Sequence, residues 1–228
     1  MELNKLFILV LLALASACQK NAPDQSAFRL HTGKETGLDF ENKLVQSEAF
    51  NVFNYMYFFN GGGVAAGDFN QDGLVDLYFT SNMGPNQFFL NQGDLKFKNQ
   101  TEAAGLAGSS GAWSSGVSVV DINQDGLLDL YVSQVGDYAI LKGKNQLFIN
   151  QGLENGVPKF IDQAADYGLD LVGFGTQAAF FDYDLDGDLD MYQLNHSLPQ
   201  NVTFGRRFTF NGNRHPLSGD LFLKNENG

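Results

Sequence analysis

The sequence has few of the residues from which disulfide bonds and familiar catalytic sites are built. Its 228 residues include one cysteine, three histidines and one tryptophan. A lone cysteine excludes an intrachain disulfide. The sequence contains no G-x-S-x-G elbow, phosphate-binding loop or H-E-x-x-H motif, and no Cys/His or Ser/His pair has a suggestive spacing. Residues 173–178 mimic a dinucleotide fingerprint, but they lead into a predicted strand rather than a helix. Catalytic signals are therefore weak.

Basic residues are also scarce. Lys and Arg number 14 against 26 Asp and Glu, which gives a formal net charge of −12. This balance argues against nucleic acid as a partner. Eleven of the 26 acids lie in three short stretches, 68–76, 121–129 and 182–190, and the other fifteen nearly match the basic residues. The acidity is therefore local, and it does not indicate a disordered acidic tail.

All three acidic stretches fit one pattern, D-x-[DN]-x-D-G-x-x-D. Oxygen-bearing side chains at positions 1, 3, 5 and 9, a glycine at position 6 and a backbone carbonyl at position 7 suit a hard cation such as calcium. The sequence thus predicts three Ca²⁺ sites. Their predicted ligands are Asp68, Asn70, Asp72, Leu74 and Asp76; Asp121, Asn123, Asp125, Leu127 and Asp129; and Asp182, Asp184, Asp186, Asp188 and Asp190.

These loops differ from the EF-hand, which needs a glutamate at position 12 and a helix on each side. Position 12 is Phe79, Val132 or Gln193, and aromatic and aliphatic residues that favour strands follow each loop. We therefore expect each loop to join two strands. A single loop of this composition could also be an ordinary turn, but three copies in register favour metal binding.

The N-terminus predicts export. Residues 1–17 resemble a signal peptide, in which the apolar run 6–14 is too short to span a bilayer. Cys18 follows Ala-Ser-Ala, which resembles the lipobox of bacterial lipoproteins, so we expect Cys18 to be lipidated and residues 18–27 to form a tether. The alternative is a plain signal peptide with a chance cysteine. The predicted location is the outer membrane, on its surface or periplasmic side, with membrane contact through the lipid anchor only.

Internal repetition organises the rest of the chain. After a lead-in segment, 28–63, we predict repeats at 64–116, 117–176 and 177–228, the last one incomplete. Each repeat begins with a strand, the acidic loop and a second strand, and the complete repeats continue with two more strands. Units of this length with four strands are typical of β-propeller blades. The predicted fold is all-β, about two and a half blades, which cannot close a ring, so we expect a fragment of a longer chain.

Two recurring segments carry a family resemblance. Residues 62–68 (Gly-Gly-Val-Ala-Ala-Gly-Asp) together with 86–93 (Asn-Gln-Phe-Phe-Leu-Asn-Gln-Gly) resemble the FG-GAP/VCBS repeats of integrin α-subunit propellers, and look most like bacterial relatives of cartilage acidic protein. The resemblance covers residues 36–228. It implies a calcium-bearing propeller of the seven-blade type at the cell surface or in the periplasm.

A candidate partner surface lies at the end of the strands opposite the loops. The third repeat carries a long insert, 195–219, which has no Asp, Glu or Lys but is rich in arginine and phenylalanine. Such loops are often functional, although this one could also fold over the propeller and bury its phenylalanines. Trp113 should lie on the same face, as a core residue or as a ligand contact. The predicted partner-binding residues are Arg206, Arg207, Arg214, His215 and Trp113.

The leading hypothesis is a calcium-stabilised propeller that binds a protein or glycan, with calcium in a structural role. One alternative is a glycan-active lyase or hydrolase with acid/base residues on the face opposite the metals, for which His196, His215 and Arg214 would be the candidates. Another alternative is a purely structural surface scaffold. The sequence does not identify the ligand.

Overall fold

The computed structural model describes residues 27–197 and 217–226. The chain divides into two compact units, residues 1–32 and 33–228. In the first unit, the described residues 27–32 contain no helix or strand. No helix within the described ranges is long and apolar enough to cross a membrane. The predicted signal peptide and lipidated Cys18 lie outside the described residues.

Three antiparallel sheets make up the described part of the second unit, accompanied by two short helices, α2 (Gly33–Thr36) and α3 (Thr101–Ala104). The sheets have the orders β1-β2-β3-β4, β5-β6-β8-β9 with β7 paired to β6, and β10-β11-β12. The all-β prediction is confirmed, and the arrangement is compatible with a β-propeller. The strands are β1 Val64–Gly67, β2 Asp76–Phe79, β3 Gln87–Asn91, β4 Phe97–Asn99, β5 Trp113–Val120, β6 Asp129–Tyr138, β7 Leu141–Lys142, β8 Gln146–Glu154, β9 Val157–Asp162, β10 Gly175–Phe181, β11 Asp190–Asn195 and β12 Leu221–Leu223.

The acidic loops occupy the same place in every sheet, between its first and second strands. The pair of residues that closes each loop has the same register: Gly67 faces Asp76, Val120 faces Asp129, and Phe181 faces Asp190. The aromatic and β-branched residues after each loop form β2, β6 and β11, as the sequence predicts. Each loop therefore joins two antiparallel strands.

The second sheet is longer than the first. β5 begins at Trp113, and β6 runs on to Tyr138, where it forms a hairpin with β7. The predicted boundary at residue 116 therefore falls within β5. Trp113 is the first residue of β5, because Trp113 and Ser114 continue the pairing with β6 beyond an irregularity between Ser114 and Val117.

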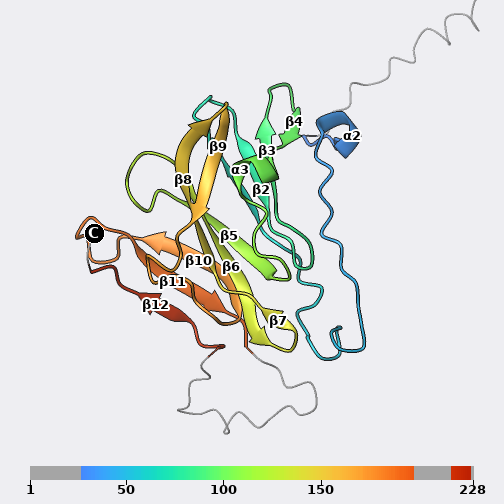
Figure 1. Ribbon diagram of the computed structural model, residues 1–228, viewed down its shortest axis with the longest axis vertical. Helices are drawn as coiled ribbons and strands as arrows, with labels where there is room; N and C mark the ends of the chain where they lie inside the picture. The colour runs from blue at the N-terminus through green and yellow to red at the C-terminus, as the bar shows by residue number, and fades with distance from the viewer. Residues whose placement is uncertain (1–26, 198–216, 227–228) are drawn as a thin grey trace, which may run out of the picture. The chain divides into compact units, whose positions relative to one another are not determined.

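Neighbouring sheets pack through apolar faces, with the β5-β6-β8-β9 sheet between the other two (Figure 1). One buried cluster joins Tyr78, Phe88 and Leu90 of the first sheet with residues of the second, such as Leu130. A further cluster joins the second sheet to the third through Tyr131, Leu147 and Ile149 on one side and Ala178 and Met191 on the other. The three sheets therefore follow one another in chain order.

The first strands of neighbouring sheets lie against each other. Ser115 Oγ donates a hydrogen bond to the Gly175 carbonyl at 2.6 Å, and Gln177 Nε2 donates to the Val117 carbonyl at 3.1 Å. At Gly116 a side chain has no room, since a Cβ there would lie 2.2 Å from the Thr176 carbonyl oxygen. β5 and β10 are thus held together by polar contacts at close approach.

A group of packed residues, which we call the aromatic cluster, covers the ends of the strands that lie opposite the acidic loops. It combines the lead-in segment with the start of β5 and the end of β6. Trp113 lies at its centre, with ring centroids 5.3 Å from Phe50, 5.4 Å from Tyr55 and 5.5 Å from Phe58. The buried members of the cluster are Phe50, Tyr55, Phe58, Trp113, Val135, Leu141 and Phe174.

Candidate metal loops

The loop backbone turns through two left-handed residues. The position-6 glycines Gly73, Gly126 and Gly187 have φ of 83°, 85° and 98°. Residues with a side chain are strained at such angles, which accounts for glycine at this position. The fourth position also has positive φ, and Gln71 and Gln124 occupy it in the first two loops. The same backbone path therefore recurs at each sheet.

The first aspartate of every loop organises the turn by accepting two backbone N–H groups. Asp68 Oδ1 accepts the amide of Asp72 at 3.0 Å, and its Oδ2 accepts the amide of Gly73 at 2.8 Å. The same pair of bonds recurs in the other loops at 3.1 and 3.0 Å for Asp121, and at 3.2 and 3.1 Å for Asp182. These carboxylates are therefore fixed in one place relative to their strands.

The last aspartate of each loop is buried and connects the loop to the third strand. Asp76, Asp129 and Asp190 are at most 1% exposed. Each accepts the amide of the second loop residue on one oxygen, and on the other the amide of an asparagine in the third strand or just after it. The latter bonds are 2.8 Å from Asn91 to Asp76, 2.8 Å from Asn150 to Asp129 and 2.9 Å from Asn225 to Asp190. The third-strand asparagine is thus part of the loop structure.

Burial raises the pKa of Asp76 to about 6, and it does the same for Asp129. The backbone hydrogen bonds to each carboxylate oppose this shift, while the neighbouring loop aspartates, such as Asp72 and Asp125, reinforce it. Without a cation, the buried end of these two loops thus holds negative charge at a free-energy cost. A bound divalent ion would reverse that effect.

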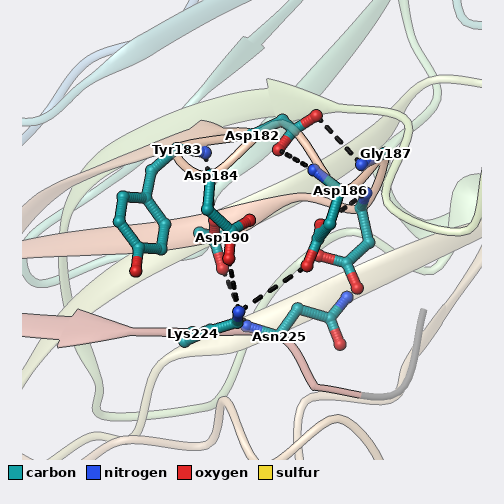
Figure 2. A network of polar contacts seen from close by, with 9 residues as sticks. Asp182, Tyr183, Asp184, Asp186, Gly187, Asp190, Lys224 and Asn225 are labelled. Atoms are coloured by element: carbon teal, nitrogen blue, oxygen red, sulfur yellow. Dashed lines mark hydrogen bonds and ion pairs between the residues drawn. The ribbon is translucent and has the colours of Figure 1, made fainter.

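The third loop carries more acid than the others, because Asp184 replaces Asn70 and Asn123 at position 3 and Asp188 replaces a leucine at position 7. Figure 2 shows its carboxylates converging. Oxygens of Asp182, Asp184 and Asp190 lie within 4.8 Å of one another, the only such acidic group in the described part of the chain. A cluster of three aspartates is therefore present at this loop.

Lys224, the residue directly after β12, contacts the same aspartate cluster. Its Nζ donates to Asp184 Oδ2 and lies 3.7 Å from Asp186 Oδ2 (Figure 2). This hydrogen bond lowers the pKa of the Asp184 carboxyl, and the pKa of the Lys224 ammonium group is raised in turn. The third loop thus has a cationic side chain within reach of two of its carboxylates.

The donor atoms of all three loops are carboxylate, amide and carbonyl oxygens, with no histidine or cysteine. Calcium takes six to eight oxygen ligands, whereas zinc and copper sites use nitrogen and sulfur. The buried, fixed aspartates therefore fit a hard cation such as calcium. The residues that could hold it are those predicted from the sequence.

The predicted partner-binding residues have different outcomes. Arg206, Arg207, Arg214 and His215 lie outside the described residues. Trp113 is 2% exposed within the aromatic cluster, which favours the core role.

His196, a candidate in the enzyme alternative, stacks on Phe174 with ring centroids 5.0 Å apart, and its Nε2 lies 3.0 Å from Tyr55 Oη. Burial lowers the pKa of this imidazole. The same ring also lies 4.0 Å from the Tyr57 ring, measured between centroids. These contacts describe a packed histidine at the edge of the aromatic cluster.

Sequence reasoning missed two contributions to the loop end. The side chains of Gln71 and Gln124 each donate to the position-6 glycine of the next loop, at 2.9 Å to Gly126 and 3.0 Å to Gly187. It also missed Lys224. Aligning the third-strand segments of the three repeats would have revealed Lys224, because it occupies the position of Leu90 in the first repeat and of Ile149 in the second.

Part of the chain is similar to a known repeat family. Residues 54–132 match the FG-GAP-like repeat family model. Human cartilage acidic protein 1 is 28% identical over 138 residues, which cover 58% of this chain and 20% of that protein. The mouse protein of the same name is 28% identical over 135 residues, with the same shares. The chain spans about a fifth of the length of these curated relatives. The FG-GAP resemblance seen in the sequence is thus confirmed.

Proposed function

The chain carries an FG-GAP-like repeat, and from this and the loop geometry we propose that it forms part of a calcium-stabilised β-propeller that binds a protein or glycan. The single observation that carries the proposal is the recurrence of one hydrogen-bonded loop at three successive sheets. The proposed location is the outer membrane, to which a lipid on Cys18 attaches the chain. Partner and location rest on the sequence patterns alone.

The propeller assignment is supported by the outer face of the third sheet. Tyr78 pairs with Phe88, and Tyr131 with Leu147, and all four side chains are buried against neighbouring structure. The equivalent pair in the third sheet, Tyr192 and Phe222, is 37% and 46% exposed. A face that is buried in two sheets and exposed in the next is free to pack against a further sheet. We propose that further blades continue the series toward a seven-blade ring.

Calcium at all three loops is supported by the fixed oxygen atoms of the first and last aspartates. These side chains are held by backbone amides, so the cation would not have to order them. Two unit charges 4 Å apart near a protein surface repel by about 4 kcal/mol. The chemistry that calcium supplies here is neutralisation of this repulsion, and the protein's part is to hold the oxygens. The role is therefore structural.

A binding role at the opposite end is supported by its composition. The lead-in segment exposes Phe53, Met56 and Phe59 beside the buried aromatic cluster. Arginine and aromatic side chains are common anchors at interfaces, and the insert supplies both. The packed state of His196 favours binding over the enzyme alternative.

The calcium proposal is tested by thermal unfolding of the full-length protein in millimolar calcium and in chelator. Calcium should raise the unfolding temperature, and Asp129→Asn should remove part of that increase, because the second loop loses a charged ligand at the residue that also accepts two backbone amides. Asp94→Asn is the matched control, an exposed left-handed turn residue outside the loops. Equal unfolding temperatures in calcium and in chelator would rule out the structural role.

The location proposal has a separate test. Cys18→Ser should move the protein from the membrane fraction to the soluble fraction, since a lipid anchor is its only proposed membrane contact. A variant that stays with the membrane would refute the lipid anchor. For the partner, Arg206→Ala with Arg207→Ala should weaken binding to cell-surface extracts, and unchanged binding would favour the structural scaffold.

A further inference from the structure

We propose that Lys224 is the internal counter-cation of the third loop and competes with calcium for its carboxylates. The inference rests on the proposed calcium function and adds to it a residue that sets the affinity of one site. The positive charge of Lys224 would then offset part of the negative charge of the third loop before any ion binds. The first two loops have no equivalent cation among the described residues.

The position of Lys224 is the first observation. In the first two sheets the residue before the third-strand asparagine is Leu90 or Ile149, and both side chains are buried in the cores between sheets. In the third sheet Tyr192 pairs with Phe222, which places Lys224 opposite Asp190 in the same register. A lysine therefore stands at a position that is apolar in the other two repeats.

The contacts of Lys224 are the second observation. Asn225 donates its backbone amide to Asp190 at 2.9 Å, which holds the chain beside the loop. From there the Lys224 side chain turns to the loop, where its Nζ donates to Asp184 and lies 3.7 Å from Asp186 (Figure 2). Lys224 thus contacts two of the oxygen-bearing side chains that calcium would bind.

The charge of the loop is the third observation. The third loop has five aspartates, whereas the first and second have three each. Its extra carboxylate at position 3, Asp184, is the partner of Lys224, while the other loops have a neutral asparagine there that needs no cation. The lysine and the added acid therefore form a matched pair. An ammonium group at this place repels a divalent ion that approaches the same carboxylates.

The test is a calcium titration of the full-length protein with isotope-labelled glycine, followed by nuclear magnetic resonance. The amides of Gly73, Gly126 and Gly187 each donate to the first aspartate of their own loop, so each reports on one site. Lys224→Met should lower the calcium concentration of half-saturation at Gly187 by about five- to tenfold, the size expected for removing one nearby unit charge at high dielectric.

Lys159→Met is the matched control. Lys159 also forms an ion pair, with Glu154 at 2.8 Å, and both lysine side chains are 37% exposed. This variant should leave all three glycine responses unchanged. Lys224→Met should also leave half-saturation at Gly73 within about twofold of the unsubstituted value, because screening weakens the effect of a distant surface charge.

Two further variants separate charge from shape. Lys224→Arg keeps the positive charge and should titrate at Gly187 like the unsubstituted protein. In Asp184→Asn, which restores the asparagine of the other loops, adding Lys224→Met should have a clearly smaller effect than in the parent, because the first partner of the lysine is gone.

The outcomes distinguish this inference from the calcium proposal. If all three glycine amides respond to calcium but Lys224→Met leaves half-saturation at Gly187 unchanged or raises it, the counter-cation role is wrong and calcium binding stands. If no glycine amide responds, the calcium proposal fails and this inference fails with it. A tighter site at Gly187 in Lys224→Met alone supports both.

Discussion

The two ends of the sheets are built by opposite means. At one end, the seven buried residues of the aromatic cluster, Trp113 among them, join the lead-in segment to the strands β5 and β6. At the other end, most loop side chains are exposed or half-buried, and backbone amides hold the carboxylates of the first aspartates. The first end is stabilised by apolar burial, which needs no ligand. The second end gathers like charges, and its stability should depend on a cation.

The largest effect expected from a single residue sharpens this contrast at the aromatic end. Trp113→Ala should lower the free energy of unfolding by about 3–5 kcal/mol, the usual cost of truncating a buried aromatic side chain. The loss should be the same in calcium and in chelator, because no carboxylate lies in the cluster. Denaturant unfolding measures it. Phe53→Ala, at a position 84% exposed in the same segment, is the control and should change little. A loss at Trp113 that appears only in chelator would break the comparison.

The next effect concerns pH at the loop end. Asp76 and Asp129 have a pKa of about 6 in the folded protein, above the value of about 4 in the unfolded chain. Between these values the folded state holds protons that the unfolded state has released, so metal-free stability should fall as pH rises from about 4 to about 6. Each carboxyl should contribute a loss on the order of 3 kcal/mol.

Calcium should cancel this pH dependence, because an ion on these carboxylates favours the deprotonated form. Unfolding in chelator and in calcium, measured across that pH range, provides the check. Metal-free stability that is flat or rises over this window would show that burial does not raise these two pKa values.

The smallest expected effect concerns the links between loops. Gln71→Ala removes an exposed hydrogen bond from Gln71 Nε2 to the Gly126 carbonyl, so stability should fall by less than about 1 kcal/mol. Calcium binding at the second loop should weaken slightly, since its glycine loses a contact that fixes it. Gln92→Ala, whose side chain bonds only to the adjacent Asn91 carbonyl at the end of β3, is the control. Isothermal titration calorimetry of both variants would show whether the loops are coupled at all.

Much of the loop end follows from the sequence, because it depends on local chemistry. The three D-x-[DN]-x-D-G-x-x-D patterns predict the turns, and the residues after them predict the strands β2, β6 and β11. The burial of Asp76 and its bond to Asn91 depend on β3 lying beside β2, which no single stretch of sequence specifies.

The aromatic end was less predictable for the same reason. Trp113 contacts residues more than fifty positions earlier in the chain, and the lead-in segment has no periodic pattern that would place them. Lys224 illustrates the remaining limit. The residue is evident in the sequence, but its role depends on the register that sets it opposite Asp190 and on its hydrogen bond to Asp184 in the loop.

The most direct measurement of the central claim is X-ray diffraction from crystals grown in millimolar calcium, collected at a wavelength where calcium scatters anomalously. The account predicts one anomalous peak at each loop, surrounded by the oxygens of its first, third, fifth and ninth residues, with the Lys224 ammonium group displaced from Asp184. Loops without a peak, or with Lys224 still seated on Asp184 and Asp186 at saturating calcium, would contradict it.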